Sequence, residues 1–74
     1  MADIRLATRL IIRNGNDYLI GRSSLTGQLR WSDSPWDAWW TRTRAKARSI
    51  SDKTGYEIYL FNPIAGQLRK YGGN

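Results

Sequence analysis

The sequence predicts an α+β fold: an antiparallel β-sheet of about five strands, in the order β-β-β-α-β-β, with a single amphipathic helix packed on one face. Three observations support this prediction. Apolar and polar residues alternate near the N-terminus, a helix-start signal lies in mid-sequence, and tight-turn sequences separate the other strand-like segments. Strands joined by tight turns run antiparallel. No linker or low-complexity segment divides residues 1–74, so we expect one compact domain.

The first three strands are expected at residues 3–13, 18–22 and 28–31. In the first of them, side chains alternate between an aliphatic side and a side rich in arginine. The sequence NGND that follows is a strong hairpin-turn signal, and a turn centred on it would place Arg13 opposite Tyr18. A second turn then leads to the short third strand.

A helix is expected to cover residues 35–53. Ser34 suits the N-cap position, Pro35 suits the first helical position, and Asp37 completes a capping box. Gly55 can end the helix in a left-handed conformation. The remaining segments are a strand at 55–61, a turn at 62–66, a strand at 67–71 and a frayed end at 72–74.

The letters GQLR occur twice, at residues 27–30 and 66–69. Aligned on their glycines, both segments run from a strand through Ser or Asn, Ser or Pro, Leu or Ile, and Thr or Ala to Gly. A four-residue loop built on a type I turn favours Pro or Ser early and Gly last, where φ is positive. We therefore interpret the repeat as one turn type used twice rather than as a duplicated binding motif. The turn does not explain why an arginine follows at Arg30 and at Arg69. The question that remains is whether these two arginines lie on one surface.

The chain is strongly basic, with 12 Lys and Arg against 6 Asp and Glu and a formal net charge of +6. Nine of the basic residues are arginines. Phosphates or an acidic protein surface are the natural partners of such a chain, and the planar guanidinium suits both groups better than an ammonium does. The alternative is a basic surface that has no partner.

The composition argues against catalysis. The chain has no histidine and no cysteine, which removes the usual acid/base at neutral pH, the usual transition-metal ligands and every disulfide. Asp17 and Asp37 have structural roles in a turn and a cap, and neither a Walker loop nor a dinucleotide fingerprint is present. We expect a non-enzymatic protein with no cofactor and no metal. Its longest aliphatic run, residues 10–12, is far shorter than a membrane span, so we expect it to be soluble.

One face of the first hairpin is predicted to be both basic and aromatic. Its expected members are Arg5, Arg9, Ile11, Arg13, Tyr18, Ile20, Arg22 and Trp31. Single-stranded nucleic-acid binders combine arginines that contact phosphates with aromatic rings that stack on bases. The same face could instead form a homodimer interface. The opposite side, which we expect to receive the helix, contains Ile4, Leu6, Leu10, Ile12 and Leu19.

Three tryptophans within five residues are a heavy apolar load for so small a domain. On a helical wheel, the side expected to face the core comprises Trp36, Trp40, Thr43, Ala47 and Ile50. Trp39 lies at the edge of that side, so we expect it to remain accessible to a base or a protein partner.

The basic residues of the expected helix do not form one stripe. Arg42 and Lys46 flank one side of the buried face, and Arg44 and Arg48 flank the other. We favour the interpretation that their alkyl stems cover the border of that face, with contact to nucleic acid as the alternative. The remaining candidate binding residues are Arg30, Trp39, Arg42, Lys46 and Arg69.

The stretch SDSPWDAWWTRTRAKARSISDKTG, followed by FNPIAGQLR, resembles short orphan proteins of bacteriophages and mobile elements. Many proteins of that kind inhibit host defence, anti-CRISPR proteins among them, and act by binding. The resemblance implies an inhibitor in the cytoplasm of a bacterial host that engages nucleic acid, a nucleoprotein complex or an acidic protein surface. A net charge of +6 excludes mimicry of DNA. The competing hypothesis is a structural protein that self-assembles through the basic face.

Overall fold

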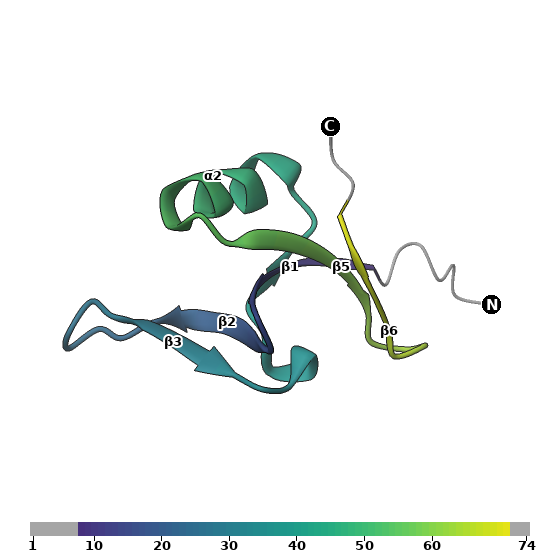
Figure 1. Ribbon diagram of the computed structural model, residues 1–74, viewed down its shortest axis with the longest axis horizontal. Coiled ribbons are helices and arrows are strands. Elements are labelled where there is room, and N and C mark those ends of the chain that lie inside the picture. The colour runs from purple at the N-terminus through teal and green to yellow at the C-terminus, as the bar shows by residue number, and fades with distance from the viewer. Residues whose placement is uncertain (1–7, 72–74) are drawn as a thin grey trace.

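A six-stranded antiparallel sheet and one α-helix make up residues 8–71, the part of the chain that the computed structural model describes (Figure 1). The strands are β1 (Arg9–Asn14), β2 (Asp17–Arg22), β3 (Leu29–Ser32), β4 (Trp40–Thr41), β5 (Glu57–Asn62) and β6 (Gln67–Lys70). The helices are the 3-10 turn η1 (Pro35–Asp37) and the α-helix α2 (Arg44–Thr54). The predicted α+β class is therefore confirmed. The expectations for Ile4, Arg5, Leu6 and residues 72–74 lie outside the described residues.

The centre of the sheet is β1, whose two edges are used differently. One edge pairs with β5 along residues 9–13. The other edge is shared, because Leu10 and Ile11 pair with β4 whereas Arg13 and Asn14 pair with β2. The predicted pairing of Arg13 with Tyr18 is confirmed. The strand order is β3-β2-β1-β5-β6. The short strand β4 pairs with the part of β1 that does not pair with β2.

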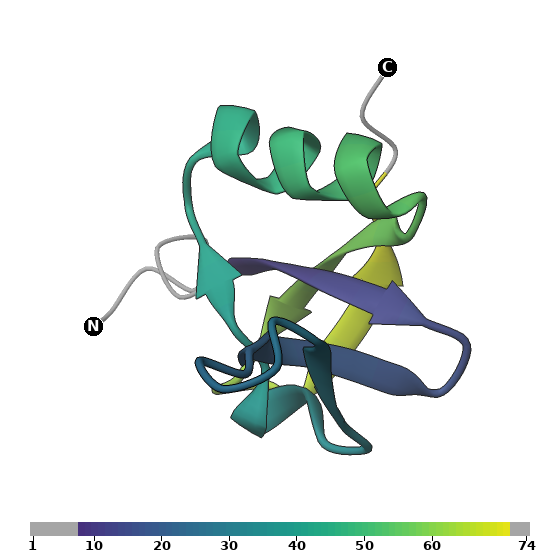
Figure 2. The same cartoon turned by 90° about the vertical axis from the view of Figure 1, so that its left-hand side faces the viewer.

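Both faces of β1 are buried, so the domain has a thin core on each side of its sheet. Ile11 and Ile12 have no exposed surface, and successive residues of a strand point to opposite faces. On one side, α2 lies above β1 and buries Ala47 completely (Figure 2). Ile12 is paired with Ile58 of β5, whose side chain points toward α2. Among the described residues, the expected aliphatic side is thus the one that receives the helix.

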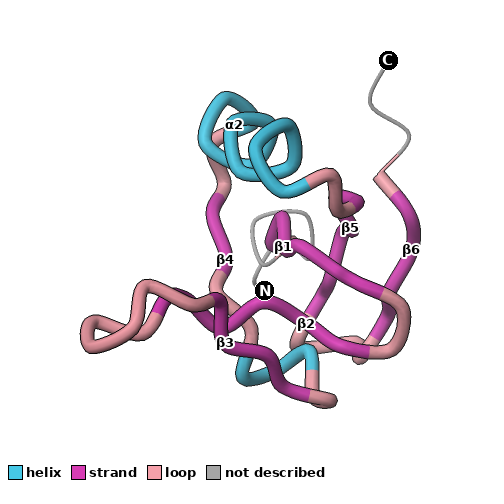
Figure 3. The backbone as a smooth tube through the Cα atoms, turned by 60° about the vertical axis from the view of Figure 1, so that its left-hand side comes forward, coloured by secondary structure: helices cyan, strands magenta, loops and turns pink. Residues whose placement is uncertain are grey.

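The other side of the sheet is closed by η1 and the residue after it. Figure 3 shows η1 and α2 on opposite sides of the sheet. The buried cluster under η1 consists of Ile11, Tyr18, Ala38 and Phe61, with Tyr59 and Leu68 packed against it. The predicted open basic and aromatic face on this side is therefore wrong at its centre, where Ile11 and Tyr18 are buried. The physical reason is that the apolar side chains on this side, among them Ile11, Tyr18 and Phe61, are more stable buried than exposed.

The helix begins nine residues later than expected, at Arg44 instead of Pro35. Pro35 does begin a helical turn, but it is a single 3-10 turn, and Ser34 makes no side-chain cap. Two long-range interactions end it: the amide of Trp39 donates to the carbonyl of Leu19 at 2.8 Å, and Trp40 pairs with β1. Sheet pairing thus overrides the local capping signal. At the C-terminal end the prediction is confirmed, since Gly55 adopts a φ of 78° and closes α2.

The helix α2 has only 11 residues and carries several charges. No helix within residues 8–71 is both long enough and apolar enough to cross a membrane.

The interpretation of the GQLR repeat as a shared turn is confirmed. The amide of Gly27 donates to the carbonyl of Ser23 at 2.9 Å, and the amide of Gly66 donates to the carbonyl of Asn62 at 2.8 Å. In each loop the side-chain oxygen of that Ser or Asn accepts hydrogen bonds from the amides two and three residues later. Gly27 and Gly66 have φ values of 74° and 68°. The two loops are therefore two copies of one four-residue turn.

The equivalence of the two hairpins extends into their strands. Arg30 pairs with Gly21, and Arg69 pairs with Leu60, at the same offset from each turn. However, β3 and β6 are the two outer strands of the sheet. Arg30 and Arg69 therefore lie on opposite edges and do not form one surface.

Replacing Gly27 or Gly66 with alanine is expected to destabilise the protein by a similar amount, about 1–2 kcal/mol, because each glycine has positive φ. A Cβ at position 66 would lie 3.7 Å from the Trp36 ring, an ordinary contact, so it adds no clash. Urea unfolding followed by circular dichroism measures the effect. Gly21→Ala is the matched control, since Gly21 lacks positive φ and a Cβ there meets nothing within 4 Å. Equal losses in all three variants would contradict the shared-turn account.

Candidate nucleic-acid interface

Trp40 is an exposed aromatic residue in the short strand β4. Its neighbour Thr41 points into the protein and is 9% exposed, whereas Trp40 is 40% exposed. The alternation follows from the pairing of Ile11 with Trp40 and of Leu10 with Thr41. The hydroxyl of Thr41 accepts a hydrogen bond from the amide of Thr43 at 3.1 Å, which fixes the chain as it leaves β4 for α2. The position of the Trp40 ring is therefore set by the sheet and not by a loop.

Two arginines lie against the Trp40 ring. The guanidinium carbon of Arg9 is 4.6 Å from the ring centroid, and that of Arg42 is 5.5 Å from it. Both distances are within the range of a cation–π interaction. Neither guanidinium forms an ion pair with a carboxylate of residues 8–71. We call Arg9, Trp40 and Arg42 the Trp40 platform.

The start of α2 adds positive charge beside the Trp40 platform. Arg44 and Lys46 lie in its first turn, that turn contains no acidic residue, and the N-cap Thr43 makes no side-chain cap. The helix dipole places a partial positive charge at the same end, so these cations are unfavourable for helix stability. A local conflict of this kind is typical of a functional site, and a bound anion would relieve it.

Tyr18 belongs to the core, and Arg13 is only partly exposed beside it. Tyr18 is 6% exposed, so its ring is not accessible for stacking. The guanidinium carbon of Arg13 lies 5.4 Å from the Tyr18 ring centroid and 4.9 Å from that of Tyr59. Its Nε atom is buried and has no hydrogen-bond partner among the described residues. Arg13 therefore covers two aromatic rings.

Trp31 lies on the opposite side of the hairpin from the side the sequence predicted. It pairs with Leu19, and the pairing shifts between Leu19 and Gly21, leaving Ile20 in a bulge. A one-residue shift exchanges the faces of a strand. As a result, the Trp31 ring packs edge-on against Tyr56, with centroids 5.0 Å apart, and does not join Tyr18.

The exposure of the three clustered tryptophans is also the reverse of the expectation. Trp36 and Trp40, assigned to the core, are 55% and 40% exposed, whereas Trp39 is only partly exposed. Trp36 packs edge-on against Phe61 and donates its Nε1 hydrogen to the carbonyl of Pro63 at 3.3 Å. Trp39 lines a hollow of about 250 Å³ between α2 and the β2–β3 hairpin. The helical wheel gave the wrong exposures because the segment with Trp39 and Trp40 is not helical.

The remaining candidate residues lie apart from the Trp40 platform. Arg22 and Arg30 are exposed on the β2–β3 hairpin, and Arg69 is exposed on β6. Of the predicted set, the structure thus brings Arg9 and Arg42 together, with Lys46 on the neighbouring helix turn. Trp40 was not among the binding residues predicted from the sequence. The alternating sequence WTRT, rich in residues that favour strands, is the signal that points to a strand there.

Lys70 on β6 forms an ion pair with Glu57 on β5. The Nζ of Lys70 lies 3.0 Å from a carboxylate oxygen of Glu57, and both side chains are more than half exposed. The hydrogen bond from Lys70 to Glu57, together with the negative charge of Glu57, raises the pKa of Lys70 above its ordinary value. Lys70 is therefore engaged with Glu57.

Residues 8–71 contain no group of three or more acidic side chains that could hold a metal ion. Comparison with known proteins gives no guide to function, because no protein-family model, no curated protein and no solved structure matches the chain.

Proposed function

We propose that this protein is a non-enzymatic binding protein that recognises single-stranded nucleic acid through the Trp40 platform. The observation that carries the proposal is an exposed indole contacted by two arginines, beside a helix start with several cations and no acid. Every base has a π-face that stacks on an aromatic ring, and such stacking is worth about 1–3 kcal/mol per base.

The arginines support binding in a second way. An exposed cation–π contact is worth only about 0.5–1 kcal/mol. A guanidinium can therefore leave the ring for a phosphate at little cost, and its departure frees the ring for a base. Paired bases are not available for stacking, so the platform favours unpaired strands over duplexes.

The resemblance to small phage proteins suggests in which biological process this binding would act. We propose that the target is the nucleic acid of a host defence nucleoprotein complex, such as a guide RNA or a displaced DNA strand. Binding there would inhibit the complex without any chemistry by the inhibitor. The positive net charge favours such a target over a site that normally receives DNA.

Fluorescence anisotropy with a labelled 12-nucleotide oligothymidylate tests the proposal. Affinity is expected to fall linearly on a log–log plot against salt, and to be weaker for a duplex of the same length. The R9A/R42A double variant is expected to bind more weakly and to lower the salt slope by about 1.4, at about 0.7 per phosphate contact on a single strand.

The R22A/R30A double variant is the matched control, since it removes the same charge from the β2–β3 hairpin. Equal losses in the two double variants would show that only net charge matters and would contradict a defined platform. Light scattering gives a second check. A stable dimer with no affinity for nucleic acid would favour self-assembly instead.

A further inference from the structure

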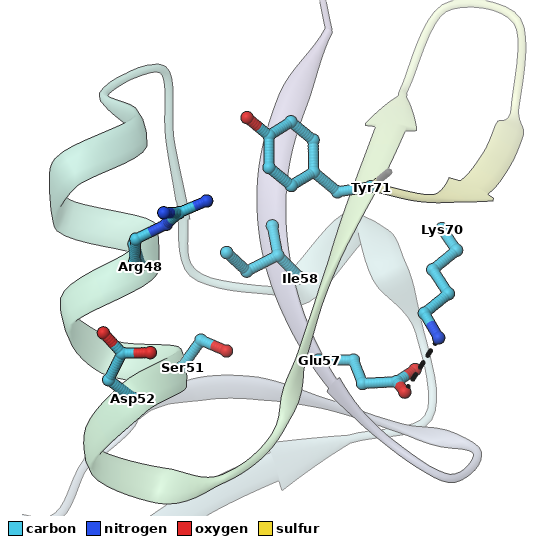
Figure 4. Close-up of a pocket in the computed structure, with 7 residues that line it drawn as sticks. All are labelled: Arg48, Ser51, Asp52, Glu57, Ile58, Lys70 and Tyr71. Atoms are coloured by element: carbon cyan, nitrogen blue, oxygen red, sulfur yellow. Dashed lines mark ion pairs between the residues drawn. The ribbon is translucent and has the colours of Figure 1, made fainter. Parts of the chain in front are cut away.

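A groove lies between α2 and the end of the sheet, on the side of the sheet that the helix covers. It consists of two adjoining hollows that share Arg48 and Tyr71. The larger hollow, about 340 Å³, is lined by Arg44, Ala45, Arg48 and Tyr71. The smaller one, about 280 Å³, is lined by Arg48, Ser51, Asp52, Glu57, Ile58, Lys70 and Tyr71 (Figure 4). Both volumes are near the lower end of those of small-ligand pockets, about 300 Å³.

The aromatic wall of the groove is held by the sheet. The amide of Tyr71 donates to the carbonyl of Ile58 at 3.0 Å, which extends the β5–β6 pairing by one residue. Tyr71 thus lies on the same side of the sheet as Ile58. In Figure 4 its ring, the Ile58 side chain and the Arg48 guanidinium all extend into the space between helix and sheet. The groove therefore contains an aromatic ring from Tyr71, an aliphatic side chain from Ile58 and a cation from Arg48.

The charges in the groove are separated along its length. Among residues 8–71, the lining of the larger hollow contains two arginines and no carboxylate. The carboxylates of Asp52 and Glu57 lie in the smaller hollow, where Glu57 is paired with Lys70. An anionic group is therefore best accommodated at the Arg44 end, and an uncharged planar group against Tyr71.

We infer that this groove binds one nucleotide unit, with its phosphate at Arg44 and Arg48 and its base against Tyr71. The inference rests on the proposed function and adds a second contact point to it. Arg44, which lies four residues after Trp40 at the start of α2, lines the same hollow as Tyr71 at the end of β6. A single strand can therefore place one base on Trp40 and another in the groove.

Titration of the ¹⁵N-labelled full chain with thymidine monophosphate, followed by amide chemical shifts, tests the groove directly. We expect saturable shifts at Ala45, Arg48, Ile58 and Tyr71. Inorganic phosphate is the comparison probe and is expected to shift the amides at the Arg44 end only, and more weakly. Equal responses to both probes would overturn base recognition and leave a simple anion site.

Variants separate the groove from the platform. Arg44→Ala is expected to weaken affinity for the mononucleotide by about tenfold, the loss of a charge-assisted hydrogen bond. Tyr71→Ala is expected to weaken it as well, whereas Tyr71→Phe keeps the ring and is expected to preserve it. Arg30→Ala, on the opposite sheet edge, is the control for charge alone. Unchanged affinity in both Arg44→Ala and Tyr71→Ala would overturn the inference.

A Trp40→Ala variant distinguishes failure of the groove from failure of the proposed function. If both are correct, this variant keeps the mononucleotide shifts and loses affinity for the 12-mer. If only the groove is wrong, wild-type protein binds the 12-mer but shows no saturable shifts with the mononucleotide. If the proposed function is wrong, Trp40→Ala leaves affinity for the 12-mer unchanged.

Discussion

Replacing Phe61 with alanine is expected to unfold most of the protein at room temperature. Phe61 has no exposed surface and belongs to the buried cluster beneath η1. Its ring packs edge-on against Trp36 with centroids 4.9 Å apart, and its strand neighbours are Arg9 and Leu68. Removing a buried Phe side chain costs about 3–5 kcal/mol. That is comparable with the whole stability that a domain of this size obtains from its core, about 3–5 kcal/mol.

Urea unfolding followed by circular dichroism measures this effect, and two further variants keep the experiment informative. Phe61→Leu retains most of the apolar volume and is expected to lose about 1 kcal/mol, so it remains folded. Ile64→Ala removes an apolar side chain that is 68% exposed, and its effect is expected to stay within about 0.5 kcal/mol. A Phe61→Ala protein as stable as Ile64→Ala would mean that the cluster under η1 does not support the fold.

Replacing Trp40 with alanine is expected to weaken binding of a single-stranded 12-mer by about 5- to 150-fold, which corresponds to a stacking energy of about 1–3 kcal/mol. The salt slope is expected to change little, because the variant removes no charge. This separates the ring from the two arginines that contact it, whose loss changes the slope. Anisotropy titrations at two salt concentrations measure both quantities.

Two controls accompany this variant. Trp40→Phe retains a π-face and is expected to recover most of the affinity. Trp36→Phe changes the other exposed tryptophan while keeping a ring against Phe61, and is expected to bind as the wild type does. Circular dichroism of each variant checks that it is folded. If Trp36→Phe and Trp40→Ala weaken binding equally, the contact surface is not centred on Trp40.

The parts of the fold that depend on local chemistry could be predicted from the sequence. The two hairpin loops follow from glycines that must adopt positive φ, and the end of α2 follows from Gly55 for the same reason. These features are decided within a few residues of the chain. They were correct because no distant contact competes with them.

The features that depend on distant partners could not be predicted. The capping signal at Ser34 competes with the pairing of Trp40 to β1, and the pairing wins because it also buries Ala38 over Phe61. The bulge at Ile20 places Trp31 on the other side of its strand from the predicted one. No local sequence pattern predicts this bulge. The first of these features decides the candidate site, because its central residue Trp40 lies in the segment for which the local signal predicts a helix.

The GQLR repeat has a consequence for solubility. The two outermost strands, β3 and β6, are each four residues long, and the repeat places an arginine in each of them. Open sheet edges invite other chains to add a strand, and short edge strands with charged side chains discourage that addition. Arg30 and Arg69 thus disfavour the addition of another strand at the two edges of the sheet. The same short sequence therefore forms the turn and places a charge on the edge strand that follows it.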